Sequence, residues 1–230
     1  MFLRQIVPIL LLATAPLCAA NSPQHHAKKN PQPAFAEKIQ IPGISDAGRV
    51  NEFLYRGSQP HEQGIEELHK LGITLIVDLR GEFRGARESE RREAEQYGMR
   101  VISIPGNGWS PPTDEQVAQF LSLFQEHPRQ RIYVHCWFGG DRSGVFLAIY
   151  RITFEHWTPQ RAVQEMKAFH FKGFWHPAMT RYVKEFPQRL NESPDLVRFR
   201  NATIQTNPDY SPRLFGGINH SAHDQPGLYF

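Results

Sequence analysis

Short apolar runs alternate with amphipathic or charged segments between about residues 50 and 190, and this alternation is the strongest constraint on the fold. The apolar, β-branched runs are predicted strands at residues 53–56, 73–79, 101–104 and 131–135. The other segments are predicted helices from Pro60 to Gly72, over 82–97, from Thr113, over 142–154, from Thr158 and over 175–190. Strand–helix alternation favours an α/β fold with a central, mainly parallel sheet flanked by helices.

The helix after Thr113 has a recognisable start. Thr113 and Gln116 have the spacing of a capping box, in which each side chain bonds the backbone N–H of the other residue. Val117, Phe120 and Phe124 then follow at helical spacing and form an apolar stripe. This helix is therefore predicted to pack on the sheet.

The segment at residues 135–144 reads His-Cys-Trp-Phe-Gly-Gly-Asp-Arg-Ser-Gly and joins a predicted buried strand to a predicted buried helix. Ligands of open α/β sheets bind where strands end, and a glycine-containing turn at a helix start presents free N–H groups to an anion. Gly139 and Gly140 allow the loop to curl with its amides inward. The segment thus predicts a phosphate site.

The same segment contains the groups for nucleophilic chemistry. The loop amides favour the thiolate of Cys136, which is the reactive form of a cysteine. The planar guanidinium of Arg142 can grip two oxygens of a phosphoryl group. Ser143 can hydrogen-bond the sulfur and help it leave, while His135 is expected to orient the loop. Trp137, Phe138, Gly139, Gly140, Asp141 and Arg142 are the predicted phosphate-binding residues.

This segment resembles the signature of the protein tyrosine phosphatase superfamily, in which His-Cys is followed by five residues and Arg-Ser or Arg-Thr. It is most similar to atypical dual-specificity phosphatases of bacteria, including periplasmic tyrosine phosphatases. Agreement extends over residues 54–60, 76–80, 111–120 and 173–176, within a match from about Val50 to Phe186. The resemblance implies a cysteine phosphatase-like fold, Cys136 as nucleophile, Arg142 as phosphate ligand, and no metal or organic cofactor.

The general acid is where the chain departs from this family. Relatives place an aspartate on the loop after the third predicted strand, but residues 105–110 read Pro-Gly-Asn-Gly-Trp-Ser. Asn107 cannot donate a proton usefully. Asp141, beside Arg142, and Asp114, in the first turn of the next helix, are the two alternatives. An aspartate in a first helical turn also stabilises the helix dipole, and Asp141 can order the loop.

Several functions remain open at this point. A phosphocysteine mechanism on phosphotyrosine or other phosphomonoesters is the main hypothesis, because Trp137, Phe138 and Trp109 can wall a pocket for an aromatic substrate. Inositol phosphates are an alternative, although Trp137 and Phe138 supply no positive charge. Two further hypotheses remain. One is a rhodanese-type sulfurtransferase, although the cysteine loop of such enzymes is one residue shorter than the loop here. The other is a catalytically weak phosphate-binding module.

Residues 1–20 are typical of a secretory signal peptide, with a basic start, an apolar stretch and small residues before Ala20. Export to the periplasm or outside the cell is therefore expected, and cleavage would leave Cys136 as the single cysteine. Lipidation of Cys18 is disfavoured by Leu17. Residues 21–44 are expected to be a disordered linker, 45–190 the phosphatase-like domain and 191–230 an irregular tail.

Net charge limits the partners. The formal charge of +3 gives no argument for nucleic acid or a membrane surface. The expected partners are a phosphorylated protein or a small phosphomonoester, without stable membrane insertion after signal cleavage. The chain is expected to be a monomer without a metal.

Overall fold

The computed structural model describes residues 34–61, 63–126 and 130–204. The predicted signal peptide and the tail beyond residue 204 lie outside the described residues. Within the described ranges no helix is both long and apolar enough to cross a membrane. The same ranges contain no cluster of His, Cys, Asp and Glu suited to a metal ion.

A six-stranded sheet forms the centre of the fold, in the order β1-β2-β3-β6-β4-β5. Strands β3, β6, β4 and β5 run parallel, whereas β1 and β2 pair antiparallel at one edge. The prediction of a mainly parallel sheet is confirmed. The strands are β1 (Glu37–Lys38), β2 (Gly48–Arg49), β3 (Leu54–Gly57), β4 (Leu75–Arg80), β5 (Arg100–Gly106) and β6 (Ile132–His135).

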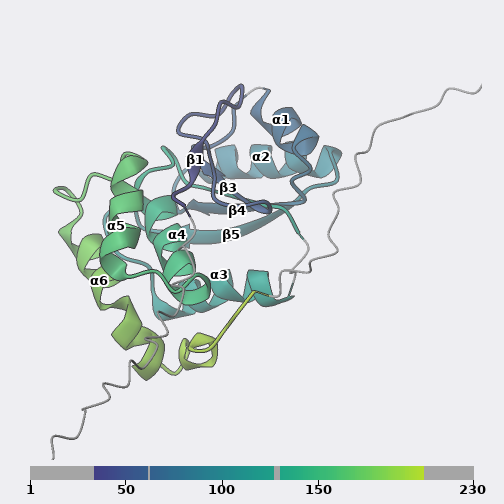
Figure 1. Cartoon of the computed structure of the whole chain (residues 1–230). Coiled ribbons are helices and arrows are strands. Elements are labelled where there is room, and N and C mark those ends of the chain that lie inside the picture. Colours follow the sequence, from purple (N-terminus) through teal and green to yellow (C-terminus); the bar gives the residue numbers. More distant parts are fainter. Residues whose placement is uncertain (1–33, 62, 127–129, 205–230) are drawn as a thin grey trace, which may run out of the picture. The chain divides into compact units, whose positions relative to one another are not determined.

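Helices cover both faces of this sheet (Figure 1). Helices α1 and α2 lie on one side and α3, α4, α5 and α6 on the other. Successive residues of one strand, such as Ile76 and Val77, enter different apolar clusters because strand side chains alternate between faces. The helices are α1 (Gly64–Lys70), α2 (Arg84–Gln96), α3 (Asp114–Glu126), α4 (Asp141–Phe154), α5 (Pro159–Ala168) and α6 (Pro177–Glu192).

Two helix starts follow the predicted chemistry. The Thr113 amide donates to Gln116 Oε1 at 2.9 Å and the Gln116 amide donates to Thr113 Oγ1 at 3.3 Å, which confirms the capping box. Thr158 accepts a hydrogen bond from the amide of Arg161 at the start of α5. The first helix begins at Gly64 rather than Pro60, and the Gly64 amide donates to the His61 carbonyl at 2.7 Å.

The ordered unit extends beyond the expected limits of 45–190 on both sides. Residues 34–44, expected to be linker, contain β1 and the buried side chains of Ala36, Ile41 and Ile44. At the other end Leu196 and Phe199 are fully buried, the latter in a 3-10 helix (Val197–Phe199). A few apolar side chains per segment suffice for this packing, and they are too sparse to give a periodic pattern.

Candidate active site

The Cys136 loop lies at the middle of the sheet edge. His135 ends β6, and α4 begins at Asp141 with Gly140 as its N-cap. Because β6 lies between the parallel strands β3 and β4, its carboxyl end opens at the centre of the edge where α/β sheets bind ligands. The Cys136 side chain is buried beneath this loop, with the residue 3% exposed.

Gly139 lets the loop approach the end of β3. Its φ angle is +81°, in the left-handed region, and a Cβ atom there would lie 2.6 Å from the carbonyl carbon of Gly57. A Cβ on Gly140 would lie 3.2 Å from the carbonyl oxygen of His170, on the other side of the loop. Close backbone packing therefore excludes a side chain at Gly139 and leaves little room for one at Gly140.

Arg56, on β3, contacts the Cys136 loop. This fully buried side chain on β3 donates from Nη2 to the Gly139 carbonyl at 2.7 Å, and its guanidinium carbon lies 4.1 Å from the centre of the Phe169 ring. Its Nε and Nη1 are buried and form no hydrogen bond to any described residue. Burial lowers the pKa of Arg56 to about 10 and outweighs the attraction of Glu165, Asp46 and Cys136, which raises it. Sequence reasoning did not single out this residue.

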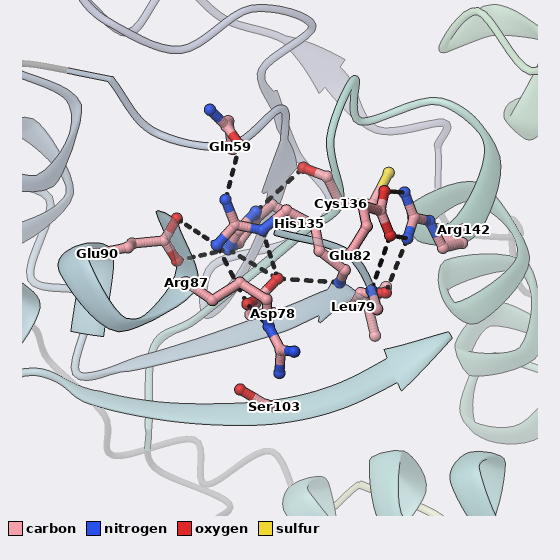
Figure 2. A network of polar contacts seen from close by, with 12 residues as sticks. Gln59, Asp78, Leu79, Glu82, Arg87, Glu90, Ser103, His135, Cys136 and Arg142 are labelled. Carbon is pink, nitrogen blue, oxygen red and sulfur yellow. Dashed lines mark hydrogen bonds and ion pairs between the residues drawn. The ribbon is translucent and has the colours of Figure 1, made fainter. Parts of the chain in front are cut away.

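Arg142 is fixed by Glu82, the residue that follows β4 by two positions. Its Nη2 lies 2.7 Å from Glu82 Oε1 and its Nη1 lies 2.8 Å from Glu82 Oε2, and Nη1 also donates to the Gly106 carbonyl at 3.1 Å. Figure 2 shows this pair beside the sulfur of Cys136. Burial opposes the charge of Arg142, but Glu82 and Cys136 raise its pKa. Sequence reasoning also missed Glu82, whose pKa is lowered by its hydrogen bonds to Arg142.

A second network joins His135 to buried charges (Figure 2). His135 Nδ1 lies 3.1 Å from the Cys136 carbonyl oxygen, and its Nε2 lies 2.9 Å from Glu90 Oε1. Arg80 pairs with Glu90 at 2.8 Å and with Asp78 at 2.8 Å. His135 thus contacts the loop backbone, in the position expected of a residue that orients it.

The two acid candidates have different partners. Asp114 accepts a hydrogen bond from the Tyr182 hydroxyl at 2.9 Å and lies 3.4 Å from Arg189 Nη1, so it is engaged with α6. Asp141 Oδ1 accepts from the Lys172 amide at 3.3 Å, and its Oδ2 lies 3.5 Å from Nε2 of His176.

The Ser143 hydroxyl does not form the hydrogen bond to the Cys136 sulfur that the sequence predicted. Ser143 is fully buried, and its Oγ forms no hydrogen bond to any described residue, including Cys136. The structure therefore brings Ser143 to the first turn of α4 without the contact to sulfur that was expected.

Aromatic side chains from four loops are called here the aromatic rim. They come from loops after β4, β5 and β6 and from the segment between α5 and α6. Phe83 lies 5.0 Å from Trp137, and Trp109 lies 5.2 Å from His176, measured between ring centroids. Large exposed apolar side chains gathered at one edge indicate a binding surface. The exposed members of the rim are Phe83, Trp109, Phe138, Phe174 and Trp175.

A family model described as "DSP-PTPase phosphatase fused to NAD+ Kinase" matches residues 40–182. The dual specificity protein phosphatase TpbA of Pseudomonas aeruginosa is 28% identical over 162 residues, which are 69% of this chain and 70% of that protein. Dual specificity protein phosphatase 26 of Rattus norvegicus is 29% identical over 140 residues, 57% of this chain and 64% of that protein. These relatives are phosphatases.

Two solved phosphatase structures resemble this chain in fold. The crystal structure of P. aeruginosa TpbA has a TM-score of 0.57 and 25% identity, and the match covers 73% of this chain and 95% of that one. The catalytic domain of the S. cerevisiae PP-IP phosphatase SIW14 has a TM-score of 0.54 at 18% identity, over 63% and 87% of the two chains, so the likeness is in the fold.

Proposed function

Because the chain belongs to the DSP-PTPase family, within the atypical dual-specificity branch of the protein tyrosine phosphatase superfamily, we propose that it hydrolyses phosphomonoesters through a phosphocysteine on Cys136. The observation that supports this most directly is the pairing of two groups at one loop. Cys136 begins the loop after the central strand, and Arg142 lies in the first turn of the helix that follows.

The proposed reaction has two displacements at phosphorus. The Cys136 sulfur forms a bond to phosphorus as the bond to the leaving oxygen breaks, and that oxygen takes a proton. A water oxygen then attacks the phosphocysteine, which releases inorganic phosphate and restores the thiolate. Loop amides at the start of α4 and the guanidinium of Arg142 stabilise the charge on the transferred oxygens.

Arg142 donates from Nη1 and Nη2 to Glu82, and from Nη1 also to the Gly106 carbonyl. Of its five N–H donors, those on Nε and the second one on Nη2 are left, so the guanidinium can keep Glu82 and still donate to phosphate. We propose that Glu82 holds the guanidinium in the plane required for this contact. Glu82 is then a positioning residue rather than a ligand of the phosphate.

The proposed substrates are aryl phosphates, with phosphotyrosine in proteins as the main class. The aromatic rim supports this proposal, because Phe83 and Trp137 on one side and Trp109 on another can contact a substrate ring. The loop between Cys136 and Arg142 contains no Lys or Arg to bind additional phosphates, which disfavours inositol polyphosphates. A TpbA structure contains pTyr, which is the ligand expected here.

A kinetic and a mass measurement test the function. The wild-type protein should release p-nitrophenol from p-nitrophenyl phosphate in a burst, and rapid acid quenching should trap one phosphoryl group on Cys136. C136S should lose both signals, whereas H170N, which changes an exposed histidine, should keep them. Turnover by C136S at the wild-type rate would contradict the proposal. Turnover of thiosulfate without phosphatase activity would instead support the sulfurtransferase.

A substrate panel tests the proposed class. Phosphotyrosine peptides should be hydrolysed with a higher kcat/KM than inositol polyphosphates by the same preparation. A clear preference for the inositol compounds would overturn this part of the proposal and leave the phosphocysteine mechanism unaffected.

We further propose that the mature protein acts outside the cytoplasm. The support is the sequence of residues 1–20, which has the charge and apolar pattern of a signal peptide. Mass spectrometry of the protein recovered from the periplasm or medium should find Asn21 as the first residue. A full-length chain confined to the cytoplasm would contradict this proposal.

A further inference from the structure

His176 is a buried histidine that the proposed mechanism has not yet used. It is the N-cap residue of α6, and its side chain is 8% exposed. One ring nitrogen, Nε2, lies 3.5 Å from Oδ2 of Asp141, while Nδ1 is buried and forms no hydrogen bond to any described residue. A buried ring with one nitrogen facing a carboxylate and the other unused resembles the arrangement of a proton-transfer group.

Contacts place this histidine next to the Arg142 site. Its ring lies 5.2 Å from the ring of Trp109, measured between centroids. The neighbouring residue, Gly108, is close to the guanidinium, since a Cβ atom there would lie 4.0 Å from Arg142 Nη2. Asp141 directly precedes Arg142 in the chain. His176 thus contacts Asp141, the residue before Arg142, and Trp109, the residue after the glycine that lies close to the guanidinium.

The site lacks a carboxylic acid at the expected position. Residues 105–110 contain no carboxylate, and Asp114 is bonded to Tyr182 and Arg189 on α6. Asp141 accepts a hydrogen bond from the Lys172 amide through Oδ1, and its Oδ2 faces His176 Nε2 at 3.5 Å, so both oxygens of this carboxylate already have a partner. An imidazolium beside that carboxylate has a proton on each nitrogen.

Resting on the proposed function, we propose that Asp141 and His176 form a paired acid that protonates the leaving group. As the Cys136 sulfur forms its bond to phosphorus, the P–O electron pair passes to the leaving oxygen, which takes a proton from His176. Neutral His176 then accepts a proton from the water that attacks the phosphocysteine, which restores the imidazolium. Asp141 holds the ring and balances its charge throughout.

The dependence of rate on leaving group tests this role. H176F, which keeps an aromatic ring against Trp109, and D141N are compared with the wild type on p-nitrophenyl, phenyl and alkyl phosphates. Loss of a general acid should lower kcat/KM about 100-fold for the poor leaving groups and less than about threefold for p-nitrophenyl phosphate. The double variant should be no slower than the slower single variant, because the two residues act as one unit.

A matched histidine on the same segment is the control. His170 is exposed and pairs with Asp46 at 2.7 Å, so H170N should leave the leaving-group dependence unchanged, while H176N should steepen it like H176F. Equal losses for all leaving groups would assign His176 a structural role and overturn the inference. If kcat/KM depended more steeply on the leaving group in D141N but not in the His176 variants, the paired acid would also be contradicted. A wild-type protein without phosphatase activity would instead overturn the proposed function.

Discussion

The carboxylate of Glu82 and the guanidinium of Arg142 form a pair of parallel hydrogen bonds, 2.7 and 2.8 Å long, between the end of one strand and the first turn of the helix after the catalytic loop. Glu82 is partly exposed, whereas the Arg142 side chain is buried. The pair therefore fixes the direction of the guanidinium that we propose binds phosphate, and its carboxylate partner is in contact with solvent.

Removal of the charge on Glu82 should weaken phosphate binding. In E82Q one of the two carboxylate oxygens that accept from Arg142 is replaced by an NH₂ group, so the orientation of the guanidinium is less restricted. We expect kcat/KM for p-nitrophenyl phosphate to fall about tenfold and the inhibition constant of vanadate to rise by a similar factor. E88Q, which changes an exposed carboxylate on helix α2, should leave both unchanged. Unchanged vanadate inhibition in E82Q would show that Arg142 does not depend on Glu82.

Replacement of Arg56 should slow the chemistry without unfolding the protein. R56M removes the hydrogen bond to the Gly139 carbonyl and a positive charge that interacts with Cys136, but it fills a similar volume. Because two guanidinium nitrogens of Arg56 are buried without a hydrogen bond to any described residue, the loss in stability should be below about 1 kcal/mol. Alkylation of Cys136 by iodoacetamide should be about tenfold slower at neutral pH. Faster alkylation, or unfolding of R56M at room temperature, would contradict this role.

An alanine at position 139 should disrupt the loop. The residue would have a left-handed φ angle and a Cβ atom 2.6 Å from the Gly57 carbonyl carbon, so G139A should lose phosphatase activity and about 2 kcal/mol of unfolding free energy. G85A is the control, because nothing lies within 4 Å of a Cβ there. In helix α2 that change should stabilise the protein by about 0.5 kcal/mol. Urea denaturation and activity assays on both variants check this contrast.

Asp78 should link stability to acid pH. Burial opposes its ionisation, but hydrogen bonds and attraction from Arg80 and His135 lower its pKa below the ordinary 3.8. Its folded-state pKa is depressed, so its contribution is present above about pH 4 and is lost as the pH falls through the folded value. D78N should cost about 3 kcal/mol at pH 7, since it removes one of the two carboxylates that pair with the buried Arg80, and this difference should shrink below pH 4.

The control for Asp78 is the fully exposed pair of Glu88 and Arg84 on the adjacent helix. E88Q should give no measurable change in unfolding free energy at either pH, because solvent screens an exposed pair. A difference between wild type and D78N that stays constant down to pH 3 would show that the charge of Asp78 is not the origin of its effect.

Local chemistry made much of the fold predictable. The four parallel strands are apolar runs, the capping box at Thr113 has a fixed spacing, and the Cys136 loop has glycines between a strand and a helix. Strands β1 and β2 were not predicted, because two residues give no periodic signal. Their place in the sheet depends on tertiary packing.

The candidate site was predictable only within its loop. Cys136 and Arg142 share one short segment, so their proximity follows from the turn itself. Glu82 begins a highly charged segment that is typical of a solvated helix, and nothing in that pattern indicates a contact to Arg142. His176 and Asp141 come from different helices, and only the packing of α5 and α6 on α4 brings them together.

The edge strand β1 sets a practical limit on how short an active fragment can be. Just before it, the Ala36 amide donates to Glu165 Oε1 at 2.7 Å, and the same oxygen lies 2.7 Å from Nη2 of Arg151 in α4. Helix α4 begins directly after the Cys136 loop, so residues 34–36 are attached to the helix that carries Arg142. A truncated enzyme that starts at residue 45 would lack this fastening, and screening for inhibitors or crystals should therefore use protein that retains residues 34–44.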